Sequence, residues 1–108
     1  MILSKLEQGK VLAIEEYSGP AADTTVPAGG TANIELAPAA KEIEIHDIIG
    51  IIDLPNVKAI SGDLSIDGIA VDNTSIPPKI TIVVRNGGAA DVTVAAGAIK
   101  MKVGVVGR

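Results

Sequence analysis

The residues of this 108-residue chain that are best suited to chemistry surround its single histidine, His46. Glu44 and Asp47 are close to it in the sequence, and a carboxylate that orients an imidazole is an arrangement that acid–base catalysis uses. Residues 41–48, however, alternate between apolar and polar side chains, which places His46 and Glu44 on the polar face of a strand. The chain also has no serine in a Gly-x-Ser-x-Gly context. We therefore expect a solvated histidine and not a catalytic one.

Three aspartates, Asp63, Asp67 and Asp72, offer a second kind of chemistry, because calcium prefers carboxylate oxygens as ligands. Their spacing does not fit an EF-hand loop, and the apolar residues between them alternate as they do in a strand. Asp67 is followed by Gly68, a pair that is typical of a hairpin turn. We therefore expect these aspartates to serve turns. The sequence predicts no cofactor and leaves open whether the three aspartates also bind an ion.

Tyr17 is the only aromatic residue of the chain, which has no Phe and no Trp. A lone tyrosine has two interpretations: it fills a core that is otherwise aliphatic, or it contacts a partner with a side chain that joins a large area to a polar tip. Without aromatic side chains, a protein lacks the usual means of stacking on bases or sugars. The net charge of -4 also disfavours binding to a phosphate backbone. We therefore expect no nucleic-acid partner.

Strands must position these residues, because the composition is rich in β-branched side chains. Ile, Val and Thr together make up 33 of the 108 residues, and they pack well on a pleated surface. The pairs Gly29–Gly30 and Gly87–Gly88 precede no helix, so we interpret them as turns and not as a phosphate-binding loop. Apolar and polar residues alternate in most segments between the turns. The predicted strands are 10–17, 31–37, 41–48, 57–62, 64–71, 79–85, 91–94 and 98–106, and residues 18–30 are predicted to form a loop.

Two details of this pattern concern how the strands run and connect. The alternation changes at Asp47, after which residues 48–52 are apolar on both faces. Such a change is expected where a bulge carries a strand into a buried position or a subunit contact. The sequence Asn86-Gly87-Gly88 predicts a hairpin between the strands 79–85 and 91–94.

About seven to nine short strands separated by turns favour an all-β fold, a single β-sandwich of the jelly-roll or immunoglobulin-like kind. We assign this domain to residues 10–108 and an N-terminal arm, with apolar Ile2, Leu3 and Leu6, to residues 1–9. The longest apolar runs are far shorter than the roughly 20 residues of a membrane-spanning helix, and no signal-peptide core is present. We therefore expect no membrane partner.

The apolar content exceeds what a domain of this size can hide. Hydrophobic residues make up 47% of the chain. A small domain leaves part of such material exposed, and contiguous apolar surface on a soluble protein marks an interaction site. We therefore expect association with further copies of the chain or with a larger assembly. The segments expected to contribute are the arm, Ile48–Ile52 and Ile99–Val106.

The stretch Ile80–Gly97 (ITIVVRNGGAADVTVAAG), followed by an alternating last strand, resembles the closing hairpin of small virion-associated β-sandwich proteins. Among such proteins, the stretch resembles those of bacteriophage capsid decoration proteins. The segment Thr25–Ala32 (TVPAGGTA) is similar to the turn that opens a strand in the same kind of protein. The resemblance covers about a third of the chain. Immunoglobulin-like surface modules share the pattern of a strand, Arg-Asn-Gly, a short strand and a glycine turn.

The resemblance implies a non-enzymatic structural protein, a capsid decoration or stabilising protein on the surface of a virion. Such proteins bind the viral shell as homo-oligomers, with a trimer favoured, and grip it with a terminal arm, which here is residues 1–9. We therefore expect the partner-binding residues to be Ile2, Leu3, Leu6 and Tyr17.

Two other hypotheses are open from the sequence. An immunoglobulin-like adhesion or accessory module of a surface protein would bind through end loops, residues 18–30 and 72–78. A hydrolase or metal enzyme would instead depend on His46 and Asp47.

Overall fold

The computed structural model describes residues 2–5, 9–40 and 43–108, which form an all-β protein, as the composition predicts. A short 3₁₀ helix, η2 (Val57–Ala59), lies between β5 and β6. No helix among the described residues is long and apolar enough to cross a membrane. The strands are β1 (Ile2–Lys5), β2 (Val11–Gly19), β3 (Thr24–Val26), β4 (Thr31–Ala40), β5 (Ile45–Asp53), β6 (Leu64–Asp72), β7 (Lys79–Asn86), β8 (Val92–Val94) and β9 (Ile99–Gly107).

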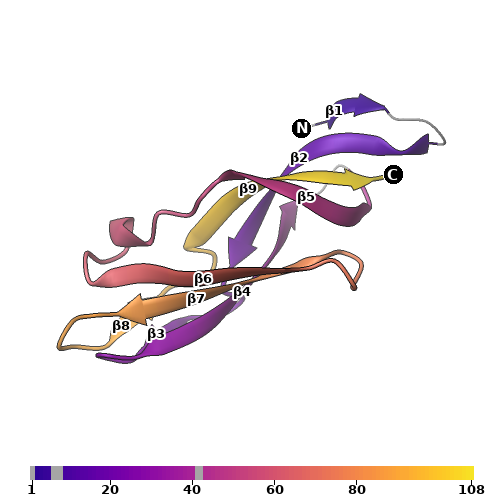
Figure 1. The fold of residues 1–108 in the computed structure, drawn as a ribbon. Coiled ribbons are helices and arrows are strands. Elements are labelled where there is room, and N and C mark those ends of the chain that lie inside the picture. The colour runs from indigo at the N-terminus through magenta and orange to yellow at the C-terminus, as the bar shows by residue number, and fades with distance from the viewer. Residues whose placement is uncertain (1, 6–8, 41–42) are drawn as a thin grey trace.

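Seven of these strands form one sheet and the other two form a second, small sheet. The order in the large sheet is β5-β9-β2-β4-β7-β6, and β1 pairs with β2 beside this path. Strands β3 and β8 pair with each other at the lower left end of the molecule in Figure 1. All of these pairings are antiparallel. The molecule is elongated, with dimensions of 53 × 23 × 20 Å.

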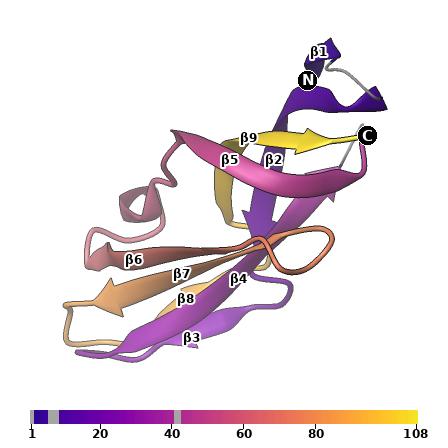
Figure 2. The same cartoon turned by 45° about the vertical axis from the view of Figure 1, so that its right-hand side comes forward.

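Strand β4 connects two halves of the large sheet because it changes partner along its length. Residues 31–36 pair with β7, whereas residues 37–40 pair with residues 16–18 of β2. We call β1, β2, β9 and β5 the upper half-sheet, and β6, β7 and residues 31–36 of β4 the lower half-sheet. Figure 2 shows β4 running diagonally from the lower half-sheet toward β2. The sheet therefore folds at β4, and its two halves enclose one core.

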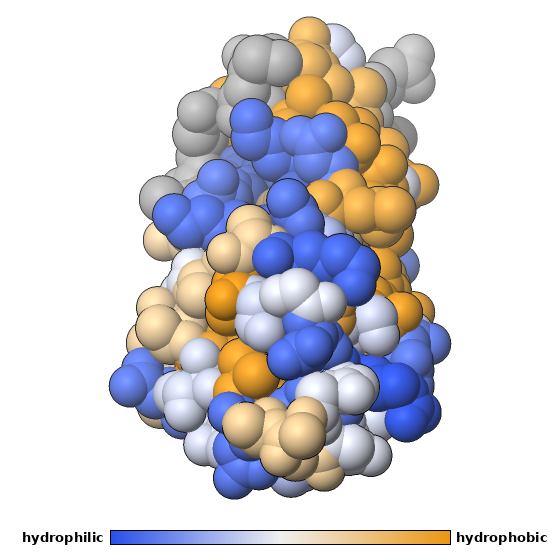
Figure 3. Space-filling view, turned by 90° about the vertical axis from the view of Figure 1, so that its left-hand side faces the viewer, coloured by the Kyte–Doolittle hydropathy of each residue, from blue (hydrophilic) through white to orange (hydrophobic). Residues whose placement is uncertain are grey.

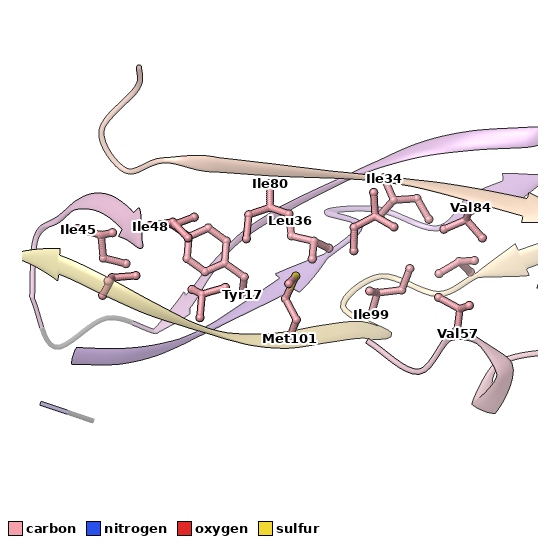
Figure 4. Packing of buried hydrophobic residues seen from close by; sticks show 14 of the residues in the cluster. Tyr17, Ile34, Leu36, Ile45, Ile48, Val57, Ile80, Val84, Ile99 and Met101 are labelled. Carbon is pink, nitrogen blue, oxygen red and sulfur yellow. The ribbon is translucent and has the colours of Figure 1, made fainter. Parts of the chain in front are cut away.

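The core is aliphatic and lies on the inner faces of the two half-sheets. Side chains alternate along a strand with a period of two, and every second residue of β2 from Val11 to Gly19 is buried. Figure 4 shows the buried side chains in a row along the molecule. The two half-sheets contribute Ala13, Tyr17, Ile45, Ile48, Ile99, Met101, Val103 and Val105 on the upper side and Ile34, Leu36, Leu64, Ile80, Ile82 and Val84 on the lower side.

The predicted hairpin at residues 86–88 is wrong, because β8 does not pair with β7. It pairs with β3, which lies within residues 18–30, a segment predicted to be loop. Asn86 explains the difference: it is buried, and its Nδ2 donates hydrogen bonds to the carbonyls of Val26 at 3.1 Å and Ala90 at 2.8 Å. These bonds hold the chain that follows β7 against β3.

Two further local predictions are wrong and one is confirmed. Residues 57–62 are not a strand, because the 3₁₀ helix at residues 57–59 occupies their first part. Residues 67–68 are not a hairpin turn but lie inside β6, where the register against β7 shifts in the manner of a bulge. The predicted change near Asp47 is confirmed, since the register of β5 against β9 shifts between Ile45 and Asp47.

Gly19 allows β2 to pass close to β4. A Cβ added to this residue would lie 2.3 Å from the carbonyl oxygen of Glu35 and 2.8 Å from Cδ2 of Leu36. We expect Gly19→Ala to lower the free energy of unfolding by about 1–3 kcal/mol, because β4 must move to relieve the overlap. Urea denaturation measures the change. Gly62→Ala is the matched control, since nothing lies within 4 Å of its added Cβ, and equal losses in the two variants would contradict this interpretation.

Candidate interaction surface

Exposed large apolar side chains are concentrated on the upper half-sheet. Of the eight such side chains among the described residues, six lie on β1, on β5 or directly after β5. Figure 3 shows apolar residues gathered at the upper right, while polar residues cover much of the lower part. The other two, Val71 and Ile76, are in and after β6. We call the six residues of the upper half-sheet the apolar surface: Ile2, Leu3, Ile49, Ile51, Ile52 and Leu54.

Strand β5 exposes apolar residues because it is an edge strand whose register against β9 shifts at three points. Each shift changes which side chain faces the core. Ile48 is 7% exposed, whereas Ile49 is 59% and Ile52 is 53% exposed. The last two cover Gly104 of β9, where an added Cβ would lie 3.6 Å from Ile49 and 3.9 Å from Ile52. The irregular β5 therefore places isoleucines on both faces of the edge.

Strand β1 supplies the other part of the apolar surface. It pairs with β2 on the side away from β9, so it lies at the opposite edge of the upper half-sheet from β5. Ile2 and Leu3, two of the predicted partner-binding residues, are each about half exposed. Leu6, a third, lies outside the described residues. Residues 2–5 of the predicted arm are thus a strand that lies against the sheet.

The expectation that Ile99–Val106 contributes to an apolar surface is wrong. Ile99, Met101, Val103 and Val105 are at most 2% exposed. The reason is the position of β9, which lies between β5 and β2 and directs these side chains into the core. Its alternating pattern therefore marked a central strand and not an interface.

A band of charged residues borders the apolar surface on β2, β9 and β5. Lys102 lies opposite Glu16 in one strand pair and opposite Asp53 in the other. These three residues and Lys100 line a shallow hollow of about 110 Å³. Opposite charges across neighbouring strands are favourable, so this band is stable on its own. Charged residues thus lie between the two apolar edges, β1 on one side and residues 49–54 on the other.

Asn73, directly after β6, holds the beginning of β5. Its Oδ1 accepts a hydrogen bond from the amide of Ile48 at 2.9 Å, and its Nδ2 donates one to the carbonyl of Ile48 at 3.1 Å. A side-chain amide thus takes the place of the backbone of a neighbouring strand. The contact also brings β5 and β6, the two edges of the large sheet, close together. This role could not be predicted from residue type, because asparagine is common in loops such as residues 72–78.

Tyr17 lies in the core. Its side chain is fully buried, and its hydroxyl donates a hydrogen bond to the carbonyl of Pro78 at 2.9 Å. Figure 4 shows its ring within the row of core side chains, in the same cluster as Ile48 and Ile80. Burial raises the pKa of Tyr17 from 10.0 to about 12, and the negative charge of Glu15 adds to the increase. The structure therefore agrees with the first interpretation of Tyr17, in which the residue fills the core. No part of the ring reaches the surface to contact a partner.

His46 lies on β5 and is partly exposed, as its place on a polar strand face predicts. Its Nε2 is 3.2 Å from Oε1 of Glu44, and the side chain of Asp47 is exposed. A pair this accessible to water contributes little to stability. The geometry is that of a surface contact, which becomes an ion pair when the histidine is protonated.

The three aspartates do not converge on one point. Asp67 forms an ion pair with Arg85, with 2.6 Å between Oδ2 and Nη2. Asp72 accepts hydrogen bonds from the hydroxyl and the amide of Thr74, which lower the pKa of its carboxyl. Asp63 precedes β6, so the length of this strand separates it from Asp72. Within residues 2–5, 9–40 and 43–108, no group of three or more His, Cys, Asp or Glu side chains could hold a metal ion.

The tips of the two loops of the adhesion-module hypothesis, residues 18–30 and 72–78, lie at opposite ends of β7, although the first segment begins close to Pro78, which accepts the hydrogen bond of Tyr17. The tip of the first lies at the end of β7, where the carbonyl of Gly30 accepts a hydrogen bond from the amide of Asn86. The second lies at the other end of the eight-residue β7, about 23 Å away at the rise of a strand. The first segment also borders an open groove of about 770 Å³, lined mostly by Ala and Pro.

The titration of Tyr17 tests its burial, because the chain has no other aromatic residue. We expect the tyrosinate absorbance of the folded protein to rise with a midpoint near pH 12, instead of the ordinary 10.0. Because the folded pKa is the higher one, the stability from this residue is complete below pH 10 and is lost as pH rises toward 12. Tyr17→Phe should remove this alkaline loss. A midpoint near the ordinary value in the folded protein would show that the ring is not buried.

Asn73→Ala tests the contact between Asn73 and β5. We expect it to lower the free energy of unfolding by about 1–3 kcal/mol, because the amide and carbonyl of Ile48 lose their partners. Hydrogen exchange at the amide of Ile48 should become faster. Asn73→Asp should not restore stability, since it places a carboxylate against the carbonyl of Ile48. Asn33→Ala, at an exposed position of β4, is the control, and unchanged exchange at Ile48 in Asn73→Ala would speak against the contact.

No protein-family model matches the sequence, and neither a curated protein nor a solved structure shows significant similarity to the chain.

Proposed function

We propose that this chain is a non-enzymatic structural protein that associates with copies of itself and with a larger protein assembly. The observation that carries the proposal is the apolar surface, whose six aliphatic side chains are exposed on one half-sheet. Contact of such side chains with water is unfavourable, and their clustering marks an interaction site on soluble proteins. The residues that supply the contact are those of β1 and β5, and Tyr17 supports them from the core.

The apolar surface is large enough to drive association. With about half of each side chain accessible, its six side chains together expose on the order of 600 Å², divided between the β1 edge and the β5 edge of the half-sheet. A standard interface buries about 800 Å² on each partner. At about 25 cal/mol per Å², burial of the apolar surface contributes roughly 15 kcal/mol per partner before the costs of association.

We interpret the folded sheet as a β-sandwich of the jelly-roll or immunoglobulin-like kind. The upper half-sheet would be one layer and the lower half-sheet the other, with β4 as the strand that passes between them. Strands that switch layers in this way are known from sandwiches whose sheets meet at corners. The single aliphatic core that both half-sheets enclose supports this interpretation.

The larger assembly in this proposal is a viral capsid, on which the protein would act as a decoration or stabilising protein at the virion surface. The resemblance of Ile80–Gly97 and Thr25–Ala32 to small virion-associated proteins supports this choice of partner. A homotrimer is the favoured form. The exposure of Ile2 and Leu3 is consistent with a role of the first residues in gripping a neighbour or the shell.

Charged substitutions on β5 test self-association. We expect the purified protein to form oligomers in light scattering and sedimentation measurements. The double variant Ile49→Lys/Ile52→Lys should weaken association by about tenfold or more, because each lysine must be desolvated in the interface. Thr93→Lys, on the exposed face of β8, is the matched control and should associate as the natural chain does. A natural chain that stays monomeric at high concentration would rule out the proposal.

A further inference from the structure

The upper half-sheet has two edges that carry no further strand. In the part of the chain that the structure describes, β5 pairs with β9 alone and β1 pairs with β2 alone. Unpaired edges expose rows of backbone amides and carbonyls that readily accept another strand. Both edges also carry members of the apolar surface, Ile2 and Leu3 on β1 and Ile49, Ile51 and Ile52 on β5. Each edge therefore offers the hydrogen bonds and the side chains that strand addition uses.

The directions of these two edges are complementary. Neighbouring strands are antiparallel from β5 through β9 and β2 to β1, so β5 and β1 run in opposite directions. If a second copy is placed beside the first in the same orientation, its β1 lies antiparallel to β5. The joined half-sheets then continue one antiparallel sheet without a change of pattern.

The lengths and shapes of the two strands also agree. The side chain of Asn73 already forms hydrogen bonds with the backbone amide and carbonyl of Ile48. Residues 49–53 of β5 therefore remain accessible along the edge. β1 has four residues, which fit this five-residue stretch when the second copy is shifted along β5, because within one copy β1 is level with residues 45–48. The bulges of β5 discourage a long, flat partner, but β1 is short and has a register shift of its own between Ile2 and Ser4. A short irregular strand can follow an irregular edge.

The distribution of exposed side chains distinguishes this arrangement from a symmetric pairing of two β5 strands. A pair of β5 strands would cover Ile49, Ile51 and Ile52 but leave Ile2 and Leu3 in water. Pairing of β5 with β1 of another copy covers both groups in one contact. Each β5–β1 contact then covers on the order of 600 Å² of apolar surface, summed over the two copies, out of the roughly 1,600 Å² of total surface that a standard interface buries.

We propose that copies of this chain join head to tail, with β5 of each copy pairing antiparallel with β1 of the next, and that the series closes into a ring. Contacts between unlike surfaces close into rings when the rotation between copies permits it. The inference rests on the self-association proposed above, for which it names the contact and the cyclic symmetry.

Cysteine cross-linking tests the contact directly, because the chain has no cysteine of its own. Leu3→Cys is combined in turn with Ile49→Cys, Gly50→Cys, Ile51→Cys and Ile52→Cys. Within one copy, three strand spacings of about 4.8 Å separate β1 from β5, too far for a disulfide bond. Mild oxidation should therefore link different copies in at least one of the four double variants. Native mass spectrometry should find a covalently closed ring.

The matched controls are the single variants and a double variant with its second cysteine on β8, Leu3→Cys/Thr93→Cys. None of these should form linked species beyond background. Linked dimers from Ile51→Cys alone would show symmetric β5 pairing and overturn the inference. Absence of cross-links in all four double variants, in a protein that still oligomerises, would overturn it as well.

A mixing experiment separates failure of this inference from failure of the proposed function. Ile51→Lys disables the β5 edge, and Leu3→Lys disables the β1 edge. Each variant alone should be monomeric in sedimentation. An equimolar mixture should form a one-to-one dimer, because the intact β1 of the first variant pairs with the intact β5 of the second. If the natural chain oligomerises but the mixture does not dimerise, the head-to-tail contact is wrong and self-association stands; a monomeric natural chain rules out both.

Discussion

Backbone pairing between the two half-sheets is limited to residues 16–18 of β2 and the end of β4, so side-chain packing must hold the halves together. Tyr17 lies at this junction and supplies the largest buried side chain of the core. Its hydroxyl reaches the carbonyl of Pro78 and thereby ties β2 to the loop that precedes β7. Gly19, two residues later, lets the strands approach where a side chain would separate them. The angle between the halves thus depends on a few side chains around one aromatic ring.

The narrow shape of the molecule explains why the exposed apolar residues lie at the edges of the sheet. The smallest dimension of the molecule is 20 Å, so each half-sheet has an inner face that is buried and edges that the other half does not cover. The edge at β6 is brought close to β5 by Asn73, and a bulge interrupts its pairing with β7. The upper half-sheet keeps its aliphatic edges at β1 and β5. The surplus of apolar residues is therefore a property of the edges and not of the core.

Regular alternation predicted strands well, and contacts distant in sequence escaped prediction. The strands at residues 10–17, 31–37, 79–85 and 98–106 were predicted because a period of two needs no knowledge of neighbours. The pairing of β8 with β3 was missed because Asn86, which directs it, bonds to a residue 60 positions away. For the candidate site, composition predicted a surplus of apolar residues, and the apolar runs of the arm and of Ile48–Ile52 indicated β1 and β5, although Ile48 itself is buried. The same reasoning wrongly assigned Ile99–Val106 to the surface, since alternation does not tell a central strand from an edge.

Asn73 has a consequence for how an added strand can align on β5. An ordinary edge can accept a neighbouring strand in several registers, and slippage among them leads to disordered aggregates. Here the backbone of Ile48 is already satisfied by a side chain, which acts as a fixed stop at one end of the edge. An apolar edge strand that is blocked at one end can accept a neighbouring strand in only a few registers. This restriction disfavours the growth of fibrils from a hydrophobic strand.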